Sequence, residues 1–177
     1  VEEAARLGLD ALAILDVDGM YSTVQTTMAA RAAGLPIVYG AELTLAWDAL
    51  RGIVAGSSAP GWGLVPGAED PGMRLPILAA SPNGYAHLVG AMSDRALSEP
   101  GQRHPCHDLV NLSEAGGDLV VLTGGRRGPL MRALRAGGTA PARRVLDGLV
   151  DAFGRDHVLV EWQGARGDED EVGDVLA

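Results

Sequence analysis

The stretch Ala11 to Leu45, ALAILDVDGMYSTVQTTMAARAAGLPIVYGAELTL, predicts one strand–helix–strand unit. Its short apolar run from Ala11 to Leu15 ends in an acidic, glycine-containing segment, which is typical of a buried strand followed by a turn. A helix is predicted over Ser22 to Ala33, and Gly34 marks its end. The apolar residues that recur in it at helical spacing are Val24, Met28, Ala29 and Ala32. A second strand is predicted over Ile37 to Tyr39, so the unit indicates a parallel βαβ arrangement.

Composition narrows the class of protein. The chain has 177 residues, of which 47% are hydrophobic and 4% aromatic, so its core must consist mainly of Ala, Val and Leu, as in helix-covered parallel sheets. A net charge of −9 argues against a broad nucleic-acid-binding surface, because such binding neutralises phosphates. The single cysteine, Cys106, excludes an internal disulfide and fits a reducing compartment. No apolar run approaches a bilayer span, and we expect a soluble, cytoplasmic protein without a membrane partner.

The rest of the chain continues the alternation of strand and helix. Further strands are predicted over Leu75–Ala80, Leu119–Leu122 and His157–Trp162, and helices lie between them. Residues 47–74 are rich in Gly and Pro, which predicts a long irregular loop. We therefore expect one α/β domain over residues 1–177, built as an open sheet or a barrel. The abrupt start and the acidic end of the sequence also lead us to expect a fragment of a longer chain.

Three acidic residues are the first candidate site. Asp16 and Asp18 follow the first predicted strand, and Glu42 follows the second. The carboxyl ends of parallel strands lie at the same edge of a sheet, so the three carboxylates could bind a divalent metal there. The alternative, which the spacing alone favours, is that the two aspartates shape the turn and cap the following helix.

Two further segments are weaker candidates. The glycine loop Thr123 to Gly128, TGGRRG, enters a predicted helix and could hold a phosphate with Arg126 and Arg127, although a plain turn is favoured. A loop downstream offers zinc-type ligands at short spacing, but it lacks a fourth ligand, so a solvated loop is favoured there. Its candidate ligands are His104, Cys106 and His107.

Several segments in the right order resemble a known family, the polymerase and histidinol phosphatase (PHP) domain at the start of bacterial C-family DNA polymerases, closest to the error-prone branch. They are ALAILDVDGMY, AARAAGLPIVYGAELTL, LAASPNGYAHL, LVVLTGGRRGPLMRAL and DAFGRDHVLVEW. The resemblance implies a distorted (β/α) barrel with parallel strands covered by helices. In intact relatives it implies divalent metals (Mg, Mn or Zn) that hydrolyse phosphoesters. It also implies a parent nucleotidyltransferase in DNA replication, repair and translesion synthesis, with the remainder of that polymerase as partner and DNA bound through it.

The metal motifs of the resembled family are incomplete in this sequence. The opening His-x-His strand is expected before Val1, which would make the barrel incomplete at its start and also lacking its C-terminal part. Val17 stands where a ligand histidine is expected, Arg74 replaces another histidine, and Gly125 replaces a cysteine. Gly40-Ala41-Glu42 retains the third motif. We therefore expect a degenerate site with no catalytic residue and no bound cofactor, in a segment that supports its polymerase. The alternatives are a free-standing metal-dependent phosphoesterase and an interaction module.

Overall fold

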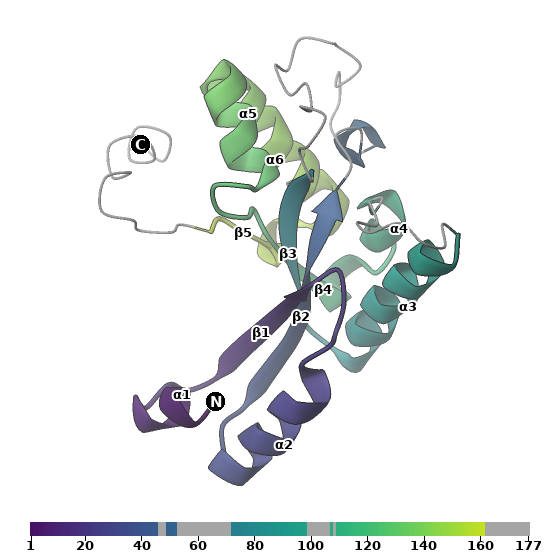
Figure 1. Cartoon of the computed structure of the whole chain (residues 1–177). Helices are drawn as coiled ribbons and strands as arrows, with labels where there is room; N and C mark the ends of the chain where they lie inside the picture. The colour runs from purple at the N-terminus through teal and green to yellow at the C-terminus, as the bar shows by residue number, and fades with distance from the viewer. Residues whose placement is uncertain (46–48, 53–71, 99–106, 108, 162–177) are drawn as a thin grey trace.

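A five-stranded sheet with the strand order β1-β2-β3-β4-β5 forms the centre of the protein (Figure 1). The computed structural model describes residues 1–45, 49–52, 72–98, 107 and 109–161. The strands are β1 (Leu12–Val17), β2 (Ile37–Leu45), β3 (Met73–Ala79), β4 (Leu119–Leu122) and β5 (Val158–Leu159). A sheet combined with helices along the whole described chain confirms the predicted α/β class.

Helices occupy the connections between the strands. They are α1 (Glu2–Arg6), α2 (Thr23–Ala33), α3 (Pro82–Ser98), α4 (Leu109–Ser113), α5 (Pro129–Gly137) and α6 (Thr139–Phe153). Short 3-10 helices cover Ala49–Gly52, Gly116–Asp118 and Arg155–His157. In Figure 1, α2, α3 and α4 lie to the right of the sheet, while α5 and α6 pack together at its upper end. None of the helices within the described ranges is long and apolar enough to cross a membrane.

The strand directions differ in part from the prediction. β1 is parallel to β2 and β4 is parallel to β5, as expected, but β3 is antiparallel to both β2 and β4. The antiparallel register places Leu75 beside Leu43 and Arg74 beside Thr44. Apolar residues therefore meet on one face of the sheet and polar residues on the other, so this register satisfies both faces. The expectation that all strands would be parallel is wrong for the two pairings of β3.

Several predicted boundaries also change. The first strand continues beyond Leu15 to Val17, so Asp16 lies inside β1 and not after its end. The second strand continues beyond Tyr39 to Leu45, so Glu42 lies inside β2 and not after its end. Within the predicted loop 47–74, residues 49–52 form a 3-10 helix and the last two residues begin β3, while 46–48 and 53–71 lie outside the described residues. Of the last predicted strand, Val158–Leu159 is a strand and His157 ends a 3-10 helix, while Trp162 lies outside the described residues.

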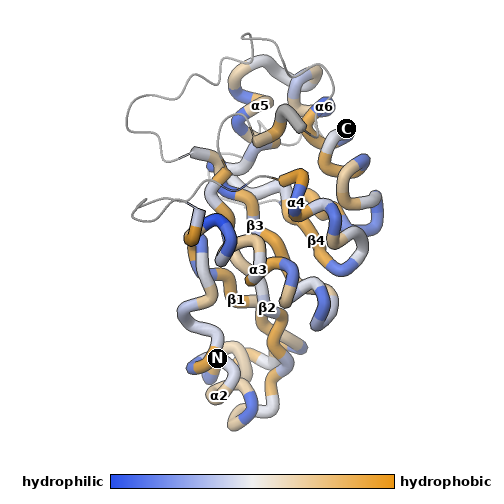
Figure 2. Tube along the Cα trace, turned by 90° about the vertical axis from the view of Figure 1, so that its right-hand side faces the viewer, coloured by the Kyte–Doolittle hydropathy of each residue, from blue (hydrophilic) through white to orange (hydrophobic). Residues whose placement is uncertain are grey.

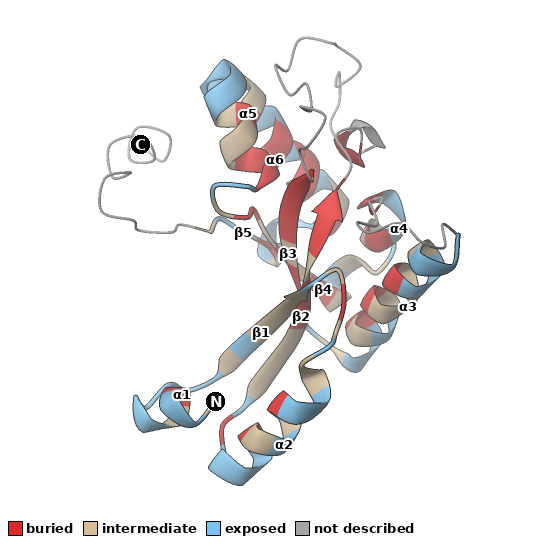
Figure 3. Ribbon diagram, in the orientation of Figure 1, coloured by how far each residue is buried: buried red, intermediate tan, exposed pale blue. Residues whose placement is uncertain are grey.

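The hydrophobic core lies on one face of β2, β3 and β4. Alternate residues of these strands point toward it, and α3, α4 and α6 cover them with apolar side chains. Members with no solvent exposure include Leu43, Leu45, Met73, Leu75, Ile77, Leu88, Leu109, Leu119, Val121, Val145 and Leu149. Figure 3 shows buried residues concentrated in the upper parts of β2 and β3, and Figure 2 shows hydrophobic residues along β3 and β4.

Helix α2 has a different buried side from the one that its apolar residues indicate. It begins at Thr23, one residue later than predicted, and ends at Ala33 as predicted, where Gly34 follows with a left-handed φ of 67°. However, Val24 and Met28 are 70% and 69% exposed, whereas Thr26 and Ala30 are buried. Helix α2 therefore buries the small side chains of Thr26 and Ala30 and leaves Val24 and Met28 on its outer surface.

Candidate metal centre

Asp18 is the central residue of the polar face of the sheet. It follows β1 directly and has a left-handed φ of 51°, a conformation that aspartate tolerates better than most residues. Its backbone N–H donates to the carbonyl oxygen of Glu42 at 3.1 Å. The carboxylate accepts two bonds from Thr44 of β2, from the backbone N–H at 2.6 Å and from the hydroxyl at 2.5 Å. These bonds connect the end of β1 to the C-terminal part of β2.

Two cationic or potentially cationic side chains flank the same carboxylate. The Nη1 atom of Arg74 donates to Oδ2 of Asp18 at 3.3 Å, and both side chains are about a tenth exposed, at 10% and 8%. On the other oxygen, Nε2 of His107 lies 3.6 Å from Oδ1. This distance is too long for a hydrogen bond, so the His107 contact is electrostatic.

Burial and these partners act on the Asp18 carboxyl in opposite directions. Burial raises its pKa, but His107, the two bonds from Thr44 and the charge of Arg74 lower it, and together they bring the pKa below the ordinary value. The carboxylate is therefore ionised at neutral pH. Its charge is stabilised by groups that the protein itself supplies.

Backbone contacts hold the main chain of Arg74, from which the guanidinium extends. Arg74 stands opposite Thr44 in the β2–β3 register, and its N–H donates to the carbonyl oxygen of Arg127 at 3.0 Å. Gly124, at φ 71°, lies so close that a Cβ there would approach the Arg74 carbonyl oxygen to 2.5 Å. The N–H of His107 donates to the carbonyl oxygen of Thr44 at 2.8 Å. Segments far apart in the sequence thus converge on Asp18.

The other two predicted metal ligands have different positions. Oδ2 of Asp16 accepts from the N–H and the hydroxyl of Ser22, at 2.7 and 2.8 Å, so Asp16 shapes the turn before α2. Glu42 lies on the polar face of β2 between Val17 of β1 and Pro76 of β3. Within the described ranges, no group of three or more His, Cys, Asp or Glu side chains is arranged to hold a metal ion.

Among the residues that the structure describes, those around Asp18 do not fit a divalent metal. Such an ion needs several oxygen, nitrogen or sulfur ligands, and repulsion by a nearby positive charge disfavours it. Val17 offers no lone pair, both Asp18 oxygens already have partners, and Arg74 brings a permanent positive charge to the carboxylate. The polar face therefore carries a closed ion-pair centre instead of an open ligand set.

The TGGRRG loop enters α5 as the sequence predicts. The loop closes through a bond from the Gly128 N–H to the Gly125 carbonyl oxygen at 2.8 Å, and Pro129 begins the helix. Arg126 and Arg127 are exposed, and their carbonyl oxygens accept from Arg135 and Arg74. These contacts are structural, and phosphate binding by Arg126 and Arg127 stays a prediction.

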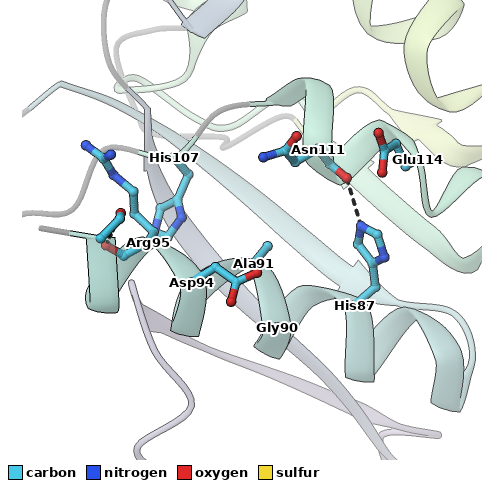
Figure 4. A pocket seen from close by; sticks show the side chains of 9 residues that line it. His87, Gly90, Ala91, Asp94, Arg95, His107, Asn111 and Glu114 are labelled. Carbon is cyan, nitrogen blue, oxygen red and sulfur yellow. Dashed lines mark hydrogen bonds between the residues drawn. The ribbon is translucent and has the colours of Figure 1, made fainter.

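His107 is the residue that sequence reasoning misplaced. It was expected in a solvated loop, but it is 3% exposed, and it contacts Asp18 while lining a cavity of about 590 Å³ between α3 and α4. Figure 4 shows His87 on α3 in the same cavity, with its Nε2 atom 2.8 Å from the carbonyl oxygen of Asn111. His104 and Cys106, the other members of the expected zinc cluster, lie outside the described residues. His107 reaches Asp18 only through the tertiary fold, so the residues beside His107 in the sequence do not indicate this contact.

Comparisons with known proteins identify the family of this chain. The family model described as the PHP domain matches residues 1–165. The chain belongs to the PHP domain family. It is 40% identical over 162 residues to the error-prone DNA polymerase of Mycobacterium bovis, covering 91% of this chain and 14% of that protein. The corresponding enzyme of Cutibacterium acnes is 40% identical over 163 residues, covering 91% of this chain and 13% of that protein.

One solved structure is also similar to this PHP domain. It is a protein of Bifidobacterium adolescentis described as a metal-dependent phosphoesterase, with a TM-score of 0.45, 14% identity, and coverage of 99% of this chain and 88% of that one. The curated polymerases are far longer. This PHP domain spans about 14% of the length of the first relatives that it matches.

Proposed function

We propose that this PHP domain is the N-terminal segment of an error-prone DNA polymerase and that it acts there as a non-catalytic scaffold. The observation that carries the proposal is the Asp18 carboxylate, which is bonded to Thr44 and paired with Arg74 where a metal would need it free. The identity to error-prone polymerases, over a small part of their length, supports the polymerase context. DNA binding, translesion synthesis, repair and a cytoplasmic location would belong to the parent protein.

A scaffold role is consistent with what the site residues do. Asp18 links β1 to β2, Arg74 links β3 to the same carboxylate, and His107 adds the segment before α4. Each contact joins elements that are distant in the sequence, so the centre holds strand ends in fixed relative positions. A fixed platform of this kind would support neighbouring parts of a polymerase chain without taking part in nucleotidyl transfer.

Metal content and hydrolysis test the non-catalytic part of the proposal. The purified chain is incubated with Mn²⁺ and Zn²⁺, dialysed, analysed for metal by mass spectrometry, and assayed with a generic phosphodiester. We expect no retained stoichiometric metal and no hydrolysis. Stoichiometric metal together with hydrolysis that Asp18→Asn abolishes, and that the exposed-site control Asp10→Asn leaves intact, would establish the phosphoesterase alternative instead.

The polymerase context has its own test in the gene. Reading the genomic frame on both sides of the codons for residues 1–177 should find an upstream His-x-His strand and a downstream polymerase palm. A short open reading frame without these segments would contradict the proposal.

The exposed row on α2 favours a second candidate function, an interaction module. Val24 and Met28 lie four residues apart on α2 and are 70% and 69% exposed, and Tyr21, two residues before the helix, is 81% exposed. Charge substitutions at Val24 and Met28 should weaken copurification with other replication proteins if this surface binds one. Unchanged copurification would remove the support for this candidate.

A further inference from the structure

Arg74 supplies a buried positive charge at the polar centre of the sheet. Its Nη1 atom lies 3.3 Å from Oδ2 of Asp18, and the exposed fractions of the two side chains are 10% and 8%. A guanidinium remains protonated at every pH at which proteins fold, and a buried carboxylate is stable only with a compensating partner. Thr44 contributes hydrogen bonds but no charge, so Arg74 is the permanent positive charge that the structure shows beside Asp18.

Backbone contacts of Arg74 constrain the position of this charge. The N–H of Arg74 is held by the carbonyl oxygen of Arg127, and its own carbonyl oxygen lies against Gly124, where a Cβ would come within 2.5 Å. The register opposite Thr44 then directs the side chain to the face where the Asp18 carboxylate lies. A side chain that extends from a fixed Cα loses less freedom on pairing than one on a loop.

We propose that Arg74 is the resident cation of this centre, neutralising Asp18 in the place of a divalent metal ion and closing the centre to such ions. This inference rests on the proposed non-catalytic function and supplies a physical reason why the centre would bind no metal ion. The guanidinium repels a second cation, and the Asp18 oxygens are committed to Thr44, Arg74 and His107. The PHP domain would therefore fold and stay folded independently of metal.

The exchange Arg74→His tests the inference, because it removes the charge and adds a nitrogen ligand at the same backbone position. His107 already lies 3.6 Å from Asp18, so the variant would combine two imidazoles and one carboxylate, a set that suits Zn²⁺ or Co²⁺. We expect saturating Zn²⁺ to raise the melting temperature of Arg74→His by about 5 to 10 °C. Co²⁺ should give it visible absorption bands. Neither effect should occur with the natural sequence, and EDTA should not lower its melting temperature.

Two controls separate this effect from non-specific binding. Arg31→His makes the same exchange at an exposed position on α2 and should respond to neither metal. Arg74→His combined with Asp18→Asn removes the carboxylate and should abolish the Co²⁺ bands. If Arg74→His is unfolded without metal, recovery of its native circular dichroism on adding Zn²⁺ counts as the expected result.

Two outcomes would overturn the inference. One is an Asp18-dependent stabilisation of the natural sequence by Zn²⁺ or Co²⁺. The other is an Arg74→His protein that gains no stability and no bands from either metal. The proposed function fails separately: hydrolysis that persists in EDTA, or a gene without a polymerase, would refute the scaffold in a polymerase while leaving the role of Arg74 intact.

Discussion

Replacing Thr44 by valine removes the hydroxyl that donates to Asp18 and keeps the shape of the side chain. Thr44 is fully buried, and its hydroxyl lies 2.5 Å from Oδ2, so no water can take its place. A hydrogen bond to a charged group contributes about 1.5–3 kcal/mol. Because the backbone N–H of Thr44 still donates, we expect the free energy of unfolding to fall by about 2 kcal/mol, which lowers the melting temperature by about 4 to 8 °C.

The loss should depend on pH, with a sign that follows from the lowered pKa of Asp18. A carboxyl whose folded-state pKa lies below its unfolded value contributes stability above the unfolded pKa of about 3.9. That contribution disappears as the pH falls through the lower pKa of the folded state. The valine variant lacks one of the bonds that lower this pKa. The difference between Thr44→Val and the natural sequence should therefore be largest at pH 7 and shrink below about pH 4.

Urea denaturation followed by circular dichroism measures both effects, provided that the m-value is unchanged. Thr27→Val is the matched control, since the Thr27 hydroxyl is part-buried and contacts the uncharged Thr23 carbonyl oxygen and Tyr39 hydroxyl at 2.6 and 2.9 Å. It should cost about 0.5–1.5 kcal/mol at either pH. Equal, pH-independent losses in the two variants would refute the role of the Asp18 charge.

Two other matched pairs give further predictions, measured by the same urea titration. Gly84→Ala should destabilise by about 1–3 kcal/mol, because its Cβ would lie 1.9 Å from the Asp118 carbonyl oxygen. Gly90→Ala in the same helix has open space and should stabilise by about 0.5–1 kcal/mol; the opposite order would show that α3 packs differently. Leu149→Ala should cost about 2–5 kcal/mol because Leu149 is fully buried. Val24→Ala, at a 70% exposed site, should change stability by less than about 0.5 kcal/mol, and a core-sized loss there would contradict the exposure of α2.

The first strand–helix–strand unit could be predicted because its signals are local. An apolar run, a polar turn and a terminal glycine lie next to one another in the chain, and α2 matches its predicted end at Ala33. The extension of β2 to Leu45 was missed because Gly40 and Ala41 have low strand propensity. In the structure Gly40 is needed, since a Cβ there would lie 2.4 Å from the Ile77 carbonyl oxygen.

The polar centre could be predicted only in part. The sequence indicated a role for Asp18 and a positive charge at position 74, but it could not show that the two meet, because 55 residues separate them and strand direction depends on tertiary pairing. Asp16 and Asp18 look equivalent in the sequence. The left-handed backbone at Asp18 turns its carboxylate toward β2. The carboxylate of Asp16 instead points toward Ser22. His107 joins them from a segment with no local signal.

Strand β2 connects two parts of the sheet. Its residues 37–42 pair with β1 and its residues 40–45 pair with β3, so only 40–42 bond to both neighbours. Residues 37–39 of β2 are partly exposed, whereas residues 43–45 are buried. Amide hydrogens of β1 should therefore exchange with solvent as one group, well before those of β3 and β4. The ion pair of Asp18 and Arg74 joins these two parts, so it adds to the free energy needed to open the first part while the second stays folded.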